Sequence, residues 1–313
     1  MQHAHGYSHV TQPRDERPLV FVGGTGRSGT HVISRLLGRH PTLADVPIES
    51  RFHCHGPKGF PDLLAGRVGV EDFLWKLREF WWHRVRKEDS EPRGLYFIIG
   101  RRRFDAAVAA FEEAYPADAV AACRRLFCDL LYPVADELGR TGLVEMSSHN
   151  VKEAPTLDRL FGHARFIHVF RDGRDVASSI TTKTWGPETL TRAIDWWADR
   201  MRAIDAGIRG DGRPLGAERF HVVLLDDLVE RDREGSYRRL LAFCGLDDAA
   251  AMREYFETAM SVGAAHRGRW RSGLGSLAVR RVERRYRSTL AALAREGNHA
   301  APALIAAAET ERE

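Results

Sequence analysis

The stretch from residue 19 to residue 41, LVFVGGTGRSGTHVISRLLGRHP, constrains the fold of this chain more than any other. It begins with an apolar run that is typical of a strand buried on both faces, as in a parallel sheet. A turn with four glycines follows, and apolar residues then recur at helical spacing until Pro41. This order predicts an anion-binding loop, because backbone N–H groups and the helix N-terminus both face the ligand.

The turn is close to the P-loop of nucleoside-triphosphate-binding proteins but departs from it at two positions. Gly24 and Gly29 fit the G-x-x-x-x-G frame, whereas Thr30 and His31 stand where that motif has Lys and then Ser or Thr. A basic residue, Arg27, lies inside the loop instead. The pattern favours a phosphate or sulfate site that works without a metal; the alternative is a turn whose glycines serve packing alone.

A second motif follows the apolar run at residues 164–170, ARFIHVF, which predicts another strand. Residues 171–179, RDGRDVASS, then turn into a helix, with Arg171 at the strand end and Ser179 eight positions later. The arginine fork and the serine hydroxyl are both good phosphate donors. The alternative is an exposed turn that caps the helix.

Together these motifs resemble those of the sulfotransferases that use 3′-phosphoadenosine 5′-phosphosulfate (PAPS), in particular the branch of the tyrosylprotein and bacterial enzymes. The resemblance covers roughly residues 19–290. It implies that the 5′-phosphosulfate is bound by Gly26, Arg27, Ser28, Gly29 and Thr30. It implies that Arg171 and Ser179 bind the 3′-phosphate, and that Arg269 or Arg271 of a late G-R-W-R loop reaches phosphate.

The same resemblance points to a catalytic base. Ile48-Glu49-Ser50-Arg51 is similar to an E-E-T-R segment whose second glutamate is the proposed base in tyrosylprotein sulfotransferases. A carboxylate can take the proton of an acceptor hydroxyl as that hydroxyl attacks sulfur. The alternative is that Glu49 is a surface residue paired with Arg51, and His149 is a rival base.

One position departs from the family. Many sulfotransferases have E-K-T-P-x-N after a strand, with a lysine that contacts the leaving group, and this chain has Met146 at the lysine position. His149 and Lys152 are near in sequence, and either could supply the missing charge. The departure leaves open a second interpretation, a protein that binds adenosine 3′,5′-bisphosphate without catalysis.

The predicted fold is α/β: a P-loop-like parallel sheet flanked by helices on both faces, with further strands at 143–146 and 220–225. Residues 61–140 have a helical pattern, and most of their aromatic residues are expected to form a helical core; the resemblance to the sulfotransferases implies that such an insertion also helps to build the acceptor pocket. We expect a disordered tail over 1–17, one sulfotransferase domain over 18–296, and a frayed C-terminal tail over 297–313.

The composition indicates the cellular location of the protein and the kind of ligand it binds. The net charge is +4, which suits an anionic ligand, and no long Lys/Arg block points to nucleic acid. Four scattered cysteines, no apolar leader and no membrane-spanning stretch indicate a reducing, cytoplasmic location. His53-Cys54-His55 matches no common zinc spacing, so no metal is expected.

The sequence thus predicts sulfuryl transfer from PAPS to the hydroxyl or amine of a small-molecule or peptide acceptor. A P-loop phosphotransferase remains the other alternative. The sequence identifies neither the acceptor nor the oligomeric state.

Overall fold

The structure is a computed structural model that describes residues 14–85, 93–210 and 215–310. Five strands form one sheet in the order β2-β3-β1-β4-β5, and all neighbouring strands are parallel. The strands are β1 (Leu19–Gly24), β2 (Leu43–Asp45), β3 (Gly142–Met146), β4 (Arg165–Phe170) and β5 (Phe220–Leu224). The predicted parallel sheet is confirmed. The short edge strand β2 was not predicted from the sequence.

Helices connect and cover the strands. They are α1 (Thr30–Leu37), α2 (Phe60–Leu64), α3 (Val70–Lys76), α4 (Arg101–Ala114), α5 (Ala119–Glu137), α6 (Ala154–Leu160), α7 (Gly173–Ile180), α8 (Leu190–Arg209), α9 (Arg233–Cys244), α10 (Ala250–Ala259), α11 (Val262–Ala265), α12 (Ser276–Arg295) and α13 (Ala301–Thr310). Short helical segments are η1 (Arg14–Glu16), η2 (Leu77–Trp81), η3 (Leu95–Phe97), η4 (Asp227–Arg231) and η5 (Arg269–Arg271). No helix in these ranges has the length and apolar character that crossing a membrane requires.

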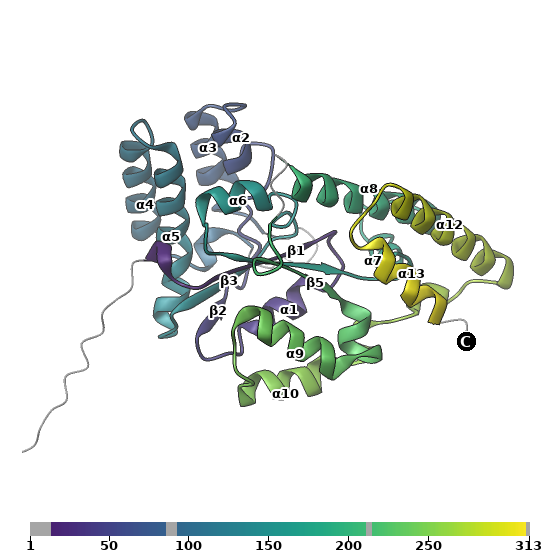
Figure 1. Ribbon diagram of the computed structural model, residues 1–313. Coiled ribbons are helices and arrows are strands. Elements are labelled where there is room, and N and C mark those ends of the chain that lie inside the picture. The colour runs from purple at the N-terminus through teal and green to yellow at the C-terminus, as the bar shows by residue number, and fades with distance from the viewer. Residues whose placement is uncertain (1–13, 86–92, 211–214, 311–313) are drawn as a thin grey trace, which may run out of the picture.

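The central strand β1 shows why the sheet is covered on both faces. Leu19 and Phe21 pack into one apolar cluster with α4, α5 and α6, whereas Val20 and Val22 pack into another with α1, α9 and α10. Successive strand residues point to opposite faces, so an uninterrupted apolar run needs cover on both sides. Figure 1 shows the sheet edge-on between α6 above and α1, α9 and α10 below.

The helical insertion predicted for residues 61–140 is present between β2 and β3 as α2 to α5. Figure 1 shows α3, α4 and α5 gathered at one end of the sheet, away from α8 and α12. Their core is aromatic: Phe73, Trp81, Phe104 and Phe111 are all buried. The insertion therefore has an apolar core that is continuous with one face of the sheet.

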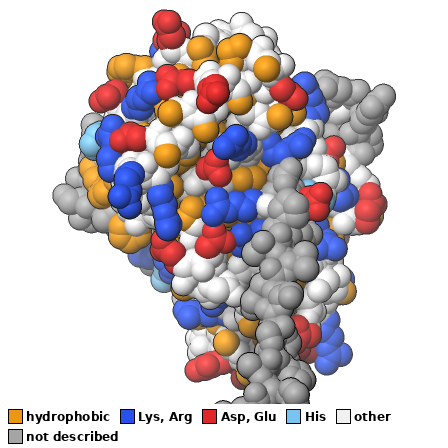
Figure 2. Space-filling model, turned by 90° about the vertical axis from the view of Figure 1, so that its left-hand side faces the viewer, with side chains coloured by type: hydrophobic (Ala, Val, Ile, Leu, Met, Phe, Trp, Pro, Cys, Tyr) orange, Lys and Arg blue, Asp and Glu red, His pale blue; other side chains and the backbone are white. Residues whose placement is uncertain are grey.

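The outer face of the insertion is covered by charges of both signs. Figure 2 shows Lys and Arg side chains interspersed with Asp and Glu on the side where Figure 1 has α4 and α5. Arg101 pairs with Asp105 at 2.9 Å, and Arg103 pairs with Glu137 at 3.3 Å. The Arg-rich run at 101–103 is thus a solvated helix face in this structure.

The two ends of the chain differ from the expected tails. Arg17 donates hydrogen bonds to the backbone oxygens of Thr141 at 2.6 Å and Arg140 at 2.7 Å, so a tail does not extend to residue 17. Residues 1–13 lie outside the described residues. The expectation that the chain frays from residue 297 is wrong, because α13 buries Ala301 and Leu304 against α8 and α12.

Candidate active site

The glycine-rich turn between β1 and α1 forms a cradle of backbone N–H groups. Gly26, Arg27 and Gly29 all have φ in the left-handed region, at 82°, 58° and 97°. Left-handed residues that alternate with right-handed ones turn successive N–H groups toward one side, which makes an anion-binding concavity. A Cβ added at Gly26 would meet nothing within 4 Å, so the space in front of the loop is open.

The cradle is fixed from behind by the loop that follows β3. The Gly24 N–H donates a hydrogen bond of 3.1 Å to the Ser148 carbonyl oxygen. Ser28 is fully buried, and its Oγ has no hydrogen-bond partner in the part of the chain that the structure describes. Thr30 begins α1 and lines the cavity in front of the loop, whereas Ser28 does not line it.

A cavity of about 940 Å³ lies in front of the cradle, at the carboxyl ends of β1 and β4. This volume is at the upper end of the range typical of ligand sites. Ligands of open parallel sheets bind at this edge. The cavity brings together the following residues expected from the sequence: Gly26, Arg27, Gly29, Thr30, Glu49, His149, Arg171, Ser179 and Arg269.

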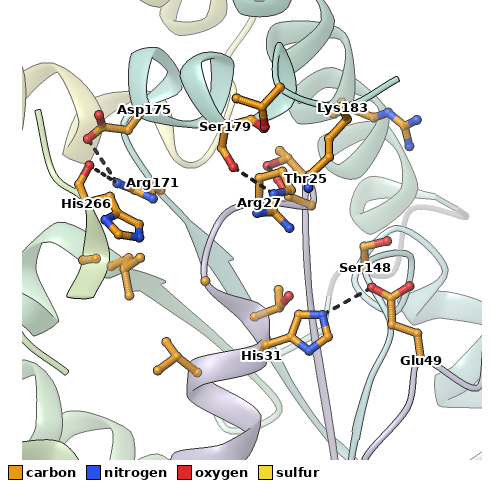
Figure 3. Close-up of a pocket in the computed structure, with 18 of the residues that line it drawn as sticks. Thr25, Arg27, His31, Glu49, Ser148, Arg171, Asp175, Ser179, Lys183 and His266 are labelled. Atoms are coloured by element: carbon orange, nitrogen blue, oxygen red, sulfur yellow. Dashed lines mark hydrogen bonds and ion pairs between the residues drawn. The ribbon is translucent and has the colours of Figure 1, made fainter. Parts of the chain in front are cut away.

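Arg27 and Ser179 join the two sequence motifs. The Arg27 Nε donates a hydrogen bond of 2.9 Å to the Ser179 Oγ on α7, although the residues are far apart in sequence. Figure 3 shows this contact between Glu49 on one side and Arg171 on the other. The cradle and the second motif therefore form one site.

Arg171 lies at the end of β4 and is nearly buried. Its Nη2 is 3.2 Å from the Asp175 carboxylate and donates to the His266 carbonyl oxygen at 3.1 Å. The buried Arg171 Nε has no partner among the described residues. Burial raises the pKa of Asp175 even though Arg171 opposes the rise. The guanidinium is thus held in place and keeps an unused donor, as an anion site requires.

Glu49 lies at the other end of the cavity and is surrounded by basic groups. The Arg51 Nε donates to Glu49 Oε2 at 2.6 Å, and both Arg84 Nη2 and His31 Nε2 lie 3.7 Å from its carboxylate oxygens. Burial acts to raise the pKa of Glu49, but the charges of Arg51, His31 and Arg84 hold it below the ordinary value. Glu49 is therefore an ionised carboxylate beside the phosphate loop, which a proton acceptor must be.

Met146, at the position of the family lysine, is buried in the core on the α1 side of the sheet. Of the two candidates to replace that charge, His149 lines the cavity and Lys152 does not. The Lys152 Nζ lies 3.5 Å from the Glu153 carboxylate. Burial, together with His55 and Arg51, lowers the pKa of His149 to about 3. Its imidazole is therefore neutral at physiological pH and offers no fixed charge.

A buried network supports the loops that present Glu49 and His149. His53 Nε2 lies 3.1 Å from Glu145 Oε2, and neither side chain is exposed. The Ser50 hydroxyl donates to Glu145 at 2.8 Å, and the Asn150 amide donates to Glu145 at 2.6 Å. The network links the segment next to Glu49 with the segment next to His149, so it holds both in position. His53 is engaged as an ion-pair partner.

The two arginines of the G-R-W-R loop lie in different surroundings. Arg269 lines the cavity, whereas Arg271 pairs with Glu283 at 3.3 Å and stacks on Trp270 outside it. The structure thus brings Arg269, and not Arg271, to the site.

Several cavity residues were missed by the sequence analysis. They are basic or aromatic: His31, Arg51, His55, Arg84, Arg93, Lys183, Trp185, Trp196 and Arg200. Arg51 adjoins Glu49 in sequence and could have been found as its neighbour. Arg84 and Arg200 lie on segments with an ordinary amphipathic pattern, and no local signal marks them.

Metal chemistry has no evident ligand set in residues 14–85, 93–210 and 215–310, where no group of three or more His, Cys, Asp and Glu could hold an ion. The residues present fit an anionic nucleotide instead. The open cradle at Gly26 and the orphaned Arg171 Nε are both suited to anionic oxygens.

Comparison with known proteins identifies the family of the chain and several similar structures. A family model described as the sulfotransferase family matches residues 18–250. Similar solved structures include the sulfotransferase domain of the Synechococcus PCC 7002 olefin synthase, with 19% identity, TM-score 0.48, and coverage of 85% of this chain and 93% of that one. Sulfotransferase STF1 of Mycobacterium tuberculosis H37Rv has 15% identity, TM-score 0.46, and coverage of 87% and 76%.

A third similar structure is mouse sulfotransferase SULT7A1 complexed with PAP, with 10% identity, TM-score 0.43, and coverage of 87% of this chain and 84% of that one. No curated protein matches the chain.

Proposed function

Because the chain belongs to the sulfotransferase family, we propose that it transfers a sulfuryl group from PAPS to a hydroxyl group of an acceptor. The observation that supports this most is the hydrogen bond from Arg27 to Ser179, which joins a cradle for one anionic group to a site for another. A donor with a 5′-phosphosulfate and a 3′-phosphate has two such groups.

The residues of the site divide into those for each end of the donor. Arg27 and the N–H groups of residues 26–30 bind the 5′-phosphosulfate, and Arg171 and Ser179 bind the 3′-phosphate. Arg269 adds charge from the η5 loop. When bound, PAPS supplies an activated sulfuryl group with adenosine 3′,5′-bisphosphate as its leaving group. Arg171 is pre-positioned by Asp175 and the His266 carbonyl, so little side-chain entropy is lost on binding.

Catalysis then requires positioning, fixed positive charge and a proton acceptor, as in the related transfer of phosphoryl groups. Glu49 accepts the proton of the acceptor hydroxyl. Arg51 donates to its carboxylate, Arg84 donates to its backbone carbonyl, and the charges of both keep the carboxylate ionised. Arg27 supplies the charge next to the leaving group that the family lysine provides elsewhere, and neutral His149 donates or accepts a hydrogen bond beside it.

A second function, nucleotide binding without catalysis, is favoured by the burial of Met146. PAPS with a radiolabelled sulfuryl group, incubated with the protein and a cell extract, separates the two. We expect a labelled product that the Glu49→Gln variant forms much more slowly, and the product should still form in EDTA. Nucleotide binding without any labelled product would support the second function. Loss of transfer in EDTA, restored by magnesium, would favour a phosphotransferase-type site.

A further inference from the structure

The cavity contains more positive charge than its donor groups account for. Among the described residues that line it, the acids are Glu49 and Asp175, and Asp175 is paired with Arg171. Against these stand one lysine and seven arginines: Arg27, Arg51, Arg84, Arg93, Arg171, Arg200 and Arg269. The proposed donor sites use Arg27, Arg171 and Arg269. Of the other arginines, Arg51 and Arg84 contact Glu49, and Arg200 is the one whose guanidinium has no acidic partner among the described residues.

The surplus charge gathers at the Glu49 end. Arg51 is ion-paired with Glu49, and the Arg84 Nη1 donates to the Glu49 carbonyl oxygen at 2.9 Å. Figure 3 shows Glu49 and Arg171 at opposite ends of the labelled residues, with Arg27 between them. Arg51 and Arg84 therefore line the part of the cavity beyond the cradle, where an acceptor must approach Glu49.

Arg200 is the clearest member of this group. It projects from α8 as an exposed residue at the rim of the cavity, and its guanidinium carbon lies 4.9 Å from the centroid of the Trp196 ring. Within the part of the chain that the structure describes it has no ion pair and no hydrogen bond. Burial and then the charge of Arg51 lower the pKa of Arg200, and the same two causes lower the pKa of Arg84 to about 10. Arg84 and Arg200 thus both lie close enough to Arg51 for their positive charges to repel one another at this end of the cavity.

An anion at this end would relieve that crowding. Concentrated charge of one sign in a crevice attracts the opposite sign and disfavours neutral ligands relative to anionic ones. The Trp185 and Trp196 rings, 6.4 Å apart, add an apolar wall beside Arg200. A ligand with an apolar body and an acidic group matches both features.

We propose that the acceptor is a small hydroxylated acid, whose carboxylate or sulfate group binds Arg200 while its hydroxyl faces Glu49. This inference rests on the proposed sulfotransferase function. It assigns Arg200 to acceptor recognition and not to the donor. Arg51 and Arg84 reinforce the field but also hold Glu49, so Arg200 is the residue to test.

The test uses protein saturated with adenosine 3′,5′-bisphosphate, so that the donor sites are filled. Calorimetric titration compares 4-hydroxybenzoate and 4-hydroxybenzenesulfonate with neutral 4-hydroxybenzamide. We expect at least one acid to bind about tenfold more tightly than the amide, and the preference to shrink as salt rises. The preferred acid distinguishes a planar carboxylate from a tetrahedral sulfonate, which stands in for a sulfate.

Two variants locate the preference. Arg200→Met keeps the apolar stem and should reduce the acid preference to about twofold or less. Arg192→Met is the matched control, because Arg192 is exposed on the same helix and does not line the cavity; it should bind as wild type. Equal binding of acid and amide, or a preference that persists in Arg200→Met, would overturn the inference. Failure of the bisphosphate itself to bind would instead count against the sulfotransferase proposal.

Discussion

Arg27 and Ser179 are 152 residues apart in the sequence, and the Arg27 Nε donates a hydrogen bond of 2.9 Å to the Ser179 Oγ. The contact ties the loop after β1 to the helix after β4, two strands that are hydrogen-bonded neighbours in the sheet. One serine thus holds the cradle arginine and faces the cavity in which a 3′-phosphate would bind.

Replacing this serine should weaken nucleotide binding. Ser179→Ala removes a hydroxyl donor to the 3′-phosphate and the anchor of Arg27, so the affinity for adenosine 3′,5′-bisphosphate should fall about tenfold. Thr181→Ala is the control, because the Thr181 hydroxyl bonds to the Ser178 carbonyl oxygen and Thr181 does not line the cavity. If calorimetry gives the two variants the same affinity, Ser179 takes no part in binding.

Replacing the proposed base should slow turnover without weakening the binding of the nucleotide. Glu49→Gln keeps the shape of the side chain but cannot take a proton, and general base catalysis typically contributes roughly 10²–10⁴-fold. Turnover should fall by about that factor while the affinity for the bisphosphate stays near wild type. A Glu49→Gln enzyme with normal turnover beside an inactive His149→Ala enzyme would move the base to the loop after β3.

The pH dependence of turnover follows from the lowered pKa of Glu49. A base works only when deprotonated, so kcat should fall on the acid side at a pH below the usual glutamate value of about 4.3. Between that point and neutral pH the profile of wild type should be flat. An acid-side decline well above pH ~4.3 would contradict Glu49 as the base; His149, whose pKa is lowered to about 3, is tested by its own variant.

The sequence was sufficient for the parts of the site that depend on local chain geometry. An apolar run, a glycine-rich turn and a helix are contiguous at residues 19–41, so the cradle could be predicted with its strand and its helix. The same holds for Arg171 and Ser179, which lie at the end of β4 and on α7.

What could not be predicted depends on packing between distant segments. Arg84 reaches Glu49 because of the way the insertion packs, and Arg200 enters the cavity because α8 lies beside it. The alanine-rich C-terminus has weak amphipathic character, yet Ala301 and Leu304 fill a space between α8 and α12. No pattern in the local sequence predicts that these side chains fill a space between two distant helices.

His149 and Lys152, two polar residues that follow the family lysine position, should behave differently when replaced. His149 lines the cavity and Lys152 pairs with Glu153 outside it. His149→Ala should therefore lower kcat with little change in nucleotide affinity, which marks an interaction made mainly in the transition state. Lys152→Ala should leave both quantities near wild type. A large fall in kcat for Lys152→Ala alone would reverse this assignment.

The buried pair of Glu145 and His53 should make stability depend on pH. Burial opposes both charges. The charge of His53 nevertheless lowers the pKa of Glu145, and Cys54 and then Glu145 raise the pKa of His53 well above its usual value. The glutamate contribution is present above about pH 4.3 and is lost as pH falls through its folded pKa. The histidine contribution is full below about pH 6.5 and is lost as pH rises through its folded pKa.

The Glu145→Gln variant tests this pair by denaturant unfolding at several pH values. The variant leaves a buried histidine without its counter-charge. At pH values between 4.3 and 6.5, its free energy of unfolding should therefore be about 3 kcal/mol lower than that of wild type. The difference from wild type should narrow in more acidic solution. A difference that is constant at every pH would contradict the ion pair and leave only a packing effect.

The account depends most on a dedicated 3′-phosphate site, and calorimetry of adenosine 3′,5′-bisphosphate against 5′-AMP tests it directly. Wild type should bind the bisphosphate far more tightly. Arg171→Met should remove most of this preference, about 1.5–3 kcal/mol for hydrogen bonds to a charged group, with little effect on 5′-AMP. Equal affinity of the wild-type protein for the two nucleotides would contradict the assignment of PAPS as the donor.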